Sequence, residues 1–227
     1  MQFFSYLING ISLGSVYALI ALGYTMVYGI AKMLNFAHGD VIMIGSYVVY
    51  FAFGASGLNP VLSIVLSMIV CTILGVVIER LAYRPLREAP SLAVLITAIG
   101  VSYLLQPVAQ LSWSSNPKSF TSVVSGMKPV SLFGGQLTIS AETIVTIVAC
   151  VVIMVVLMWF VNYTPAGHAM LAVSEDRGAA QLMGVNVNGT ISLTFAIGSA
   201  LAAIAGALLC SSYPTLQPTT GAMPGIK

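Results

Sequence analysis

Long apolar runs separated by short polar intervals dominate this chain, and they predict helices that cross a membrane. A spanning helix needs about 20 mostly apolar residues, since only internal hydrogen bonds satisfy its backbone in lipid. By this criterion the sequence predicts about six spans, at residues 7–29, 41–53, 60–78, 91–111, 141–163 and 191–212. The run at 41–53 is brief for a full crossing. The pattern predicts an all-α, polytopic integral membrane protein with a single membrane-spanning domain over residues 1–227.

Composition strengthens this prediction. Only 6% of residues are charged, 58% are hydrophobic and the mean hydropathy is +0.99, whereas about 25% of residues are charged in soluble domains. The net charge of +2 gives no reason to expect a nucleic-acid partner. Cys71, Cys150 and Cys210 each lie inside an apolar run and are interpreted as small hydrophobic residues.

The basic residues indicate which way the chain crosses the membrane. Short loops rich in Lys and Arg stay in the cytoplasm. With the spans above, one side of the membrane carries Lys32, Arg80, Arg84, Arg87 and Arg177, and the other carries Lys118 and Lys128. The first set is therefore expected in the cytoplasm, with the N-terminus outside.

Two stripes of small residues predict close helix packing. Gly10, Gly14 and Ala18 recur every four residues in the first run, and Gly198, Ala202 and Gly206 do so in the last. Small residues let a neighbouring helix approach closely in a membrane. The longest polar interval, residues 112–140, leaves room for a short β-hairpin, built from Val123, Val124, Val130, Leu132, Phe133 and Leu137.

The polar interval at residues 164–190 predicts a short helix on the cytoplasmic side. Ser174 is its expected N-cap, with the acidic Glu175 and Asp176 in the first turn, where the helix dipole favours them. Gly184 is the expected stop. On this helix Ala179, Leu182 and Met183 share one face, opposite Arg177 and Gln181. A helix of about nine residues is marginal alone, so it is either an ordinary membrane-surface helix or the docking element for a partner.

Asn35, His38, Gly39 and Asp40 form a polar patch between the first two apolar runs. Ionisable groups beside membrane helices are costly and tend to face a cavity or a partner. The residues leave three interpretations open. The patch lies on a substrate path, or His38 and Asp40 relay protons, or Asn35 and His38 only satisfy backbone groups where the helix breaks.

Motifs of catalysis are not found in the sequence. It contains no Gly-x-x-x-x-Gly-Lys-Ser/Thr loop for phosphates, no His-Glu-x-x-His and no Gly-x-Ser-x-Gly. His38 and His168 lack Cys or acidic partners at metal-ligand spacing, so no metal or resident cofactor is expected. The chain is therefore not expected to be an enzyme.

Several sequence blocks resemble those of a known family. GISLGSVYALIALGYTMVYGIAKMLNFAHGD at 10–40 resembles the N-terminal signature of permeases for branched-chain amino acids, the LivH type of ATP-binding-cassette (ABC) importer permease. ERLAYRPLR at 79–87 and ITAIGVSYLL at 96–105 match further blocks, as do GHAMLAVSEDRGAAQLMGVN and FAIGSALAAIAGALL. Ala179-Ala180 followed by Gly184 resembles the EAA loop of such permeases, which couples to the ATPase, although Gly178 replaces its glutamate.

This resemblance implies half of a translocation path for branched-chain amino acids across the bacterial inner membrane. It implies a second permease subunit, two cytoplasmic ATPases that bind the ATP, and a periplasmic substrate-binding protein, all beside membrane lipid. Family members continue past the block at 218–227 into further helices, so the sequence is expected to be C-terminally incomplete relative to the family.

Other functions remain open at this point. Related permeases for urea and other amides share much of the pattern. A proton-coupled secondary transporter or channel that uses His38 and Asp40 is an alternative of another class, and a non-transporting membrane scaffold is a third.

Overall fold

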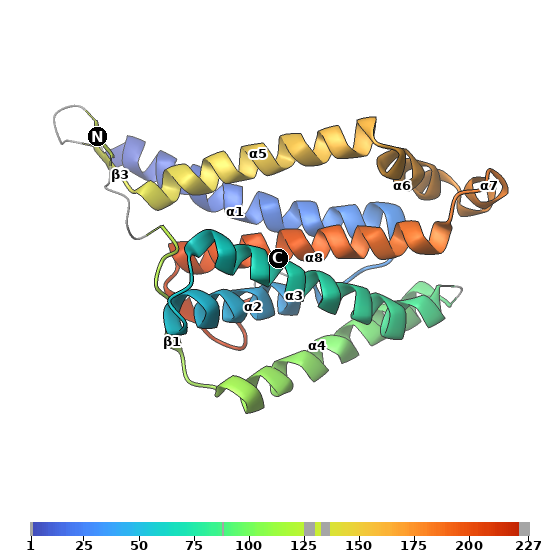
Figure 1. Cartoon of the computed structure of the whole chain (residues 1–227), viewed down its shortest axis with the longest axis horizontal. Helices are drawn as coiled ribbons and strands as arrows, with labels where there is room; N and C mark the ends of the chain where they lie inside the picture. The colour runs from blue at the N-terminus through green and yellow to red at the C-terminus, as the bar shows by residue number, and fades with distance from the viewer. Residues whose placement is uncertain (1, 88, 125–129, 133–136, 223–227) are drawn as a thin grey trace.

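Helices make up nearly all of the structure, a computed structural model that describes residues 2–87, 89–124, 130–132 and 137–222 (Figure 1). Five helices in this part of the chain are long and apolar enough to cross a membrane. They are α1 (Gln2–Ala31), α3 (Pro60–Ile78), α4 (Ser91–Trp113), α5 (Ala141–Tyr163) and α8 (Val187–Ser212). The all-α membrane fold is therefore confirmed, and the chain is a multi-pass membrane protein.

The expected span at 41–53 is the exception. The structure has there a helix of 12 residues, α2 (His38–Val49), which continues into a π-helix, η1 (Tyr50–Ala55). All but two of the residues of α2 are buried, and it packs on α3 and α8. Because neighbouring helices enclose it, α2 does not need the length of a lipid-facing span. The described part of the chain thus has five candidate spans instead of about six.

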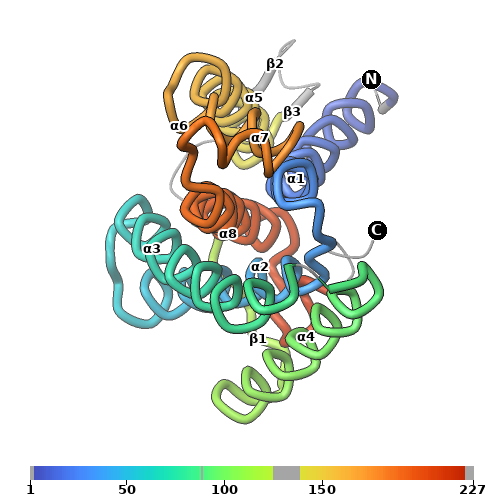
Figure 2. Tube along the Cα trace, turned by 90° about the vertical axis from the view of Figure 1, so that its right-hand side faces the viewer, coloured from blue at the N-terminus to red at the C-terminus, as the bar shows by residue number. Residues whose placement is uncertain are grey.

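Helix α8 forms the centre of the bundle. Figure 2 shows it between α1, α2 and α3, which are its main contacts. Its small residues make these contacts close: a Cβ added at Gly206 would lie 2.6 Å from the backbone oxygen of Ile42 in α2, and one at Gly198 would lie 3.1 Å from that of Gly23 in α1. The packing predicted for the 198–206 stripe is confirmed. By contrast, no described atom lies within 4 Å of a Cβ added at Gly10 or Gly14.

Short strands close one end of the bundle. β2 (Val130–Leu132) pairs antiparallel with β3 (Leu137–Ile139), which confirms a hairpin in the 112–140 interval. Val123 and Val124 lie outside its strands, and Phe133 and Lys128 lie outside the described residues. β1 (Lys118–Ser119) pairs with β4 (Thr215–Leu216) and so ties the interval to the end of α8.

The opposite end carries all the basic residues that the structure describes except Lys118. It holds the helices α6 (Pro165–Glu175) and α7 (Arg177–Leu182), the π-helix η2 (Glu79–Tyr83), the 3-10 helix η3 (Arg84–Leu86) and the start of α4 (Figure 1). Lys32, Arg87 and Arg177 line one pocket there. We call this the basic end. The gathering of these cations agrees with the charge pattern of the sequence, and its cytoplasmic location stays a prediction.

Candidate substrate path and coupling segment

The polar patch of the sequence lies where α1 gives way to α2. Only 5% of the surface of Asn35, 1% of that of His38 and 2% of that of Asp40 is exposed. Buried polar and charged groups in a membrane protein are costly unless they have partners or face a cavity. Each of the three therefore requires an explanation from its neighbours.

These neighbours differ for each residue, so the patch does not form a single cluster. The Asn35 side-chain oxygen accepts a hydrogen bond of 2.9 Å from the Tyr83 hydroxyl in η2. His38 faces α1, where its ring lies 6.2 Å from that of Tyr24. Asp40 follows His38 by two residues, which places it about 200° further around the helix axis. It therefore points away from α1 and faces α4, where it contacts Gln106. The described residues show no hydrogen bond between His38 and Asp40, whose carboxylate accepts from Gln106 instead.

The Asp40 carboxylate borders a pocket of about 340 Å³. Gln106 of α4 donates a hydrogen bond of 2.9 Å from Nε2 to Asp40 Oδ1, and a second of 3.1 Å to the Ser102 hydroxyl. The remaining walls are mostly apolar, and the full lining is Phe36, Gly39, Asp40, Ile99, Ser102, Tyr103, Gln106 and Ala222. Four residues were predicted to lie on the substrate path. Two of them, Gly39 and Asp40, line this pocket, whereas Asn35 and His38 do not.

Ser102 and Gln106 were missed by the sequence analysis. They stand four residues apart inside an apolar run, so they share one face of α4. That spacing of two polar residues in a spanning helix was the available signal. No basic side chain among the described residues forms an ion pair with Asp40. The salt bridge that these residues do contain joins Arg87 and Glu79, and neither of them lines the Asp40 pocket. The pocket therefore presents a buried carboxylate with polar but uncharged neighbours.

The predicted helix at 175–183 is in fact two helices with a break at Asp176. Glu175 is the last residue of α6, and Asp176 is the N-cap of α7, where its Oδ1 accepts from the backbone of Gly178 (2.7 Å) and Ala179 (3.0 Å). Ser174 does not cap the helix; its hydroxyl donates to the Leu171 carbonyl instead. The predictions of a Ser174 cap and of Glu175 in the first turn are wrong, because α6 continues through both residues and Asp176 caps the helix that follows.

Gly184 ends α7 as expected. Its φ is +85°, which glycine adopts without strain. The Gly184 N–H donates to the Gln181 carbonyl and the Val185 N–H to that of Ala180, each at 3.0 Å. This is the Schellman arrangement, which satisfies carbonyls at a helix end. The chain then turns back into α8.

The two sides of α7 have different surroundings. Ala180 is 4% exposed and packs on the bundle, and Arg177 donates to the Ala31 carbonyl at the end of α1. Leu182 and Met183 face outward and are 90% and 84% exposed. Ala179 is exposed as well. We call residues 175–184 the coupling segment. Its exposed apolar side chains, Ala179, Leu182 and Met183, are the three that were predicted to share one face of the helix.

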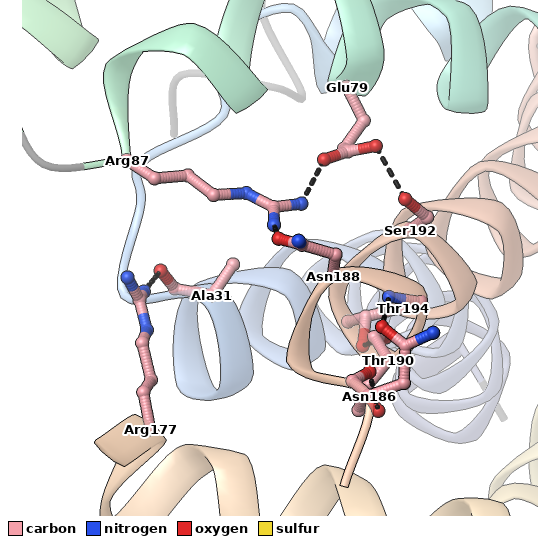
Figure 3. A network of polar contacts seen from close by, with 10 residues as sticks. Ala31, Glu79, Arg87, Arg177, Asn186, Asn188, Thr190, Ser192 and Thr194 are labelled. Carbon is pink, nitrogen blue, oxygen red and sulfur yellow. Dashed lines mark hydrogen bonds and ion pairs between the residues drawn. The ribbon is translucent and has the colours of Figure 1, made fainter. Parts of the chain in front are cut away.

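A polar network joins the loop between α3 and α4 to the start of α8 at the basic end (Figure 3). The Arg87 guanidinium bonds both the buried Glu79 carboxylate and the Asn188 side chain, four residues after Gly184. The other Glu79 oxygen accepts a hydrogen bond of 2.6 Å from Ser192. The loop between α3 and α4 is thereby joined to the first turns of α8, directly after the coupling segment.

Comparison with known proteins identifies the family. The profile described as "Branched-chain amino acid transport system / permease component" matches residues 6–227. The chain belongs to this family. It is 42% identical to the high-affinity branched-chain amino acid transport system permease protein BraD of Pseudomonas aeruginosa, over 97% of this chain and 75% of the relative. It is 40% identical to the corresponding LivH protein of Escherichia coli, over 100% of this chain and 77% of the relative.

More distant relatives extend beyond amino-acid systems. The ribose import permease protein RbsC of Haemophilus influenzae is 27% identical over 91% of this chain and 61% of its own length. No solved structure matches the chain significantly. The family resemblance inferred from the sequence blocks is confirmed: the chain is a permease component of a transport system, and not an enzyme.

Proposed function

We propose that this chain is a permease subunit of an ABC importer that carries branched-chain amino acids across the bacterial inner membrane. The names of the relatives support this substrate class. The chain would form half of the translocation path beside a second permease subunit. Two cytoplasmic ATPases would bind the ATP, and a periplasmic binding protein would deliver the substrate.

The observation that carries the proposal is the Asp40 pocket. A branched-chain amino acid is a zwitterion with an apolar side chain, so its site needs acceptors for an ammonium, a donor for a carboxylate and an apolar wall. Asp40 Oδ2 and Gln106 Oε1 would accept hydrogen bonds from the ammonium. Gln106 offers its oxygen to the substrate because both hydrogens of its amide nitrogen are used by Asp40 Oδ1 and Ser102. The Ser102 hydroxyl accepts from Gln106 and would donate its own proton to the substrate carboxylate. Phe36 and Ile99 supply apolar contact.

The same chemistry distinguishes substrate classes. Urea and simple amides are neutral and have no ammonium to compensate a buried carboxylate. A buried charge without a partner is strongly unfavourable in a membrane protein. Asp40 therefore favours an amino acid over an amide as the transported molecule.

The coupling segment supplies the link to ATP hydrolysis in this proposal. Leu182 and Met183 would insert into the ATPase, while Arg177 holds α7 against the end of α1. Movement of α7 would pass to α8 through Gly184 and to the α3–α4 loop through Arg87 and Asn188. Asn35 and His38 would position α2 beside the path through Tyr83 and α1.

Leucine uptake into proteoliposomes that contain the whole importer tests the proposal. We expect Asp40→Asn to raise the leucine KM by at least about tenfold, since hydrogen bonds to charged groups contribute about 1.5–3 kcal/mol. Asp40→Glu should recover part of the affinity. Glu142→Gln, which removes a carboxylate near the start of α5, is the matched control.

Two results would contradict the proposal. Unchanged leucine kinetics in Asp40→Asn would exclude Asp40 from the path. Uptake that a protonophore abolishes, and that continues when ATP is absent, would support a proton-coupled transporter instead.

A further inference from the structure

A second pocket of about 340 Å³ lies at the basic end. It is separate from the Asp40 pocket and shares no lining residue with it. Its walls come from the end of α1, the loop that follows it, the segment between η3 and α4, the start of α4, and α7. The lining consists of Tyr28, Lys32, Met33, Leu34, Arg87, Ala89, Ser91, Val94 and Arg177.

Three cationic side chains converge on this pocket: Lys32, Arg87 and Arg177. Of the three, Arg87 has an acidic partner among the described residues: Glu79, which also accepts from Ser192 and is fully buried outside the pocket lining. Burial lowers the pKa of Arg177, and the neighbouring charge of Arg87 lowers it further. The lining residues that the structure describes thus include three cationic side chains and no acidic one, and like charges held close together cost electrostatic energy.

Hydrogen-bond donors remain available there. The Arg87 Nε group is buried and has no hydrogen-bond partner in the described structure. Arg177 uses one of its five donors for the Ala31 carbonyl, and the described residues offer its guanidinium no second hydrogen bond. The start of α4 adds backbone donors beside Ser91, because its N-cap, Pro90, makes no side-chain cap. Positive charge and unused donors together require an anion with several acceptor oxygens.

Lys32 is held in a conformation that lysine rarely adopts. Its φ is +52°, and its N–H closes α1 by donating to the Tyr28 carbonyl at 2.9 Å. Glycine or asparagine normally occupies such a position at a helix end. Strain of this kind persists where the surrounding structure requires it and often marks a functional site. Here it places a third cation beside the two arginines.

We propose that this basic pocket binds the phosphate group of an anionic phospholipid. The position in the bundle selects a lipid over a soluble phosphate. The pocket opens at the end of the spanning helices, next to outward-facing apolar side chains of α1 and α4, including Tyr28, Leu92 and Ile96. A lipid could place its phosphate between the cations and its acyl chains along this surface, as polar and apolar groups are arranged in a bilayer leaflet.

The experiment compares lipid retention by variants of position 32. The chain is purified together with its partner subunits in detergent, and bound phosphatidylglycerol and phosphatidylcholine are counted by native mass spectrometry. The expected result is one tightly held phosphatidylglycerol per chain, and no phosphatidylcholine held at that site. Lys32→Gly should weaken its retention about fivefold, the effect of one basic side chain near a lipid surface. Glycine suits the left-handed backbone, so this variant should fold at least as well as the parent chain.

Two control variants keep the test specific. Lys32→Arg retains the charge and should retain the lipid. Lys118→Gln removes a positive charge at the opposite end of the bundle and should leave retention unchanged.

Three outcomes would overturn the proposal. Equal loss of lipid in Lys32→Gly and Lys118→Gln would show a general charge effect. Competition by glycerol 3-phosphate as strong as that by intact phosphatidylglycerol would assign the pocket to a soluble phosphate. Retention of the lipid by the permease alone, and its absence from the complex that contains the ATPase subunits, would assign the pocket to an acidic segment of that partner.

Discussion

The Tyr83 hydroxyl and the Asn35 side-chain oxygen form a buried hydrogen bond of 2.9 Å that joins η2 to the loop before α2. It links the part of the basic end that contains Glu79 and Arg87 to the segment that carries Asp40. Tyr83 itself is fully buried and lies against Phe195 of α8, with ring centroids 5.2 Å apart. This contact gives the polar loop a fixed position relative to the central helix.

We expect Tyr83→Phe to destabilise the protein by about 1–3 kcal/mol, because it leaves the Asn35 oxygen buried without a donor. Replacing both partners, as in Tyr83→Phe with Asn35→Leu, should cost less than the sum of the two single changes. Thermal unfolding in detergent, followed by tryptophan fluorescence, measures all four proteins. Strict additivity of the two substitutions would show that the hydrogen bond contributes nothing.

The Arg87–Glu79 pair gives a sharper test of the network in Figure 3. The Glu79 side chain is fully buried and that of Arg87 is 11% exposed. Arg87→Gln should destabilise by about 3–5 kcal/mol, since it leaves a buried carboxylate unpaired. Adding Glu79→Gln should restore part of this loss. Arg84→Gln, at an exposed position in the same loop, is the control and should change stability by less than about 0.5 kcal/mol.

If the Arg87→Gln protein melts at the same temperature as the Arg84→Gln protein, the ion pair does not hold the loop to α8. The same melting curves decide whether Glu79→Gln rescues or adds to the damage.

Gly206 and Gly14 belong to the two stripes of small residues, and replacing each by alanine should change the stability in opposite directions. Gly206→Ala should destabilise by about 1–3 kcal/mol, because the new methyl group meets the backbone of α2 and the fitted contact is overpacked. Gly14→Ala should be neutral or slightly stabilising, since the space beside it is open and alanine favours a helix. Melting temperatures of the two variants, measured side by side, check the pair. A large loss in Gly14→Ala would mean that another subunit covers that face.

Apolar run length and glycine spacing predicted much of the fold. The spans at residues 60–78 and 141–163 begin and end in the structure at the predicted residues. These features are local, since a lipid-facing helix needs only its own residues to satisfy its backbone. The stripe at 198–206 was predictable for a similar reason, because small residues permit close contact whichever helix is the neighbour.

The candidate sites were harder to predict, because they depend on contacts between distant residues. Asn35 bonds Tyr83, 48 positions along the chain, and Asp40 bonds Gln106, 66 positions along. The sequence pattern does not specify such pairs. The break at Asp176 was also missed: Ser174 and Asp176 are both good N-caps by residue type, and the structure uses Asp176.

The orientation of the protein in the membrane can be tested with single cysteines. The three native cysteines are buried, so they should react slowly. We expect Ala89→Cys, at the basic end, to be protected from an impermeant thiol reagent in intact cells, and Ser115→Cys, after α4, to react. The reverse labelling pattern would place the basic end outside. Labelling of both after permeabilisation is the control for access.

The last prediction concerns the coupling segment and uses the two sides of α7. Leu182 and Met183 are exposed, whereas Ala180 packs within the chain. Leu182→Glu with Met183→Glu should therefore reduce recovery of the ATPase with the permease at least tenfold, since each buried apolar side chain contributes about 1.5–3 kcal/mol. Ala179→Trp, on the exposed side, should also reduce it. Leu182→Met keeps the apolar contact and should retain the ATPase.

Ala180→Trp separates docking from folding. A tryptophan at this buried position would disrupt the packing of α7 on its own chain, so the permease should lose thermal stability before any partner binds. The Leu182→Glu/Met183→Glu protein should instead keep the melting temperature of the parent chain, because both side chains are free in its structure. Co-purification in detergent at matched expression, together with melting curves, distinguishes the two effects. Full ATPase recovery with both glutamates present, and its loss in Arg80→Gln or Arg84→Gln, would place the contact on the loop between α3 and α4.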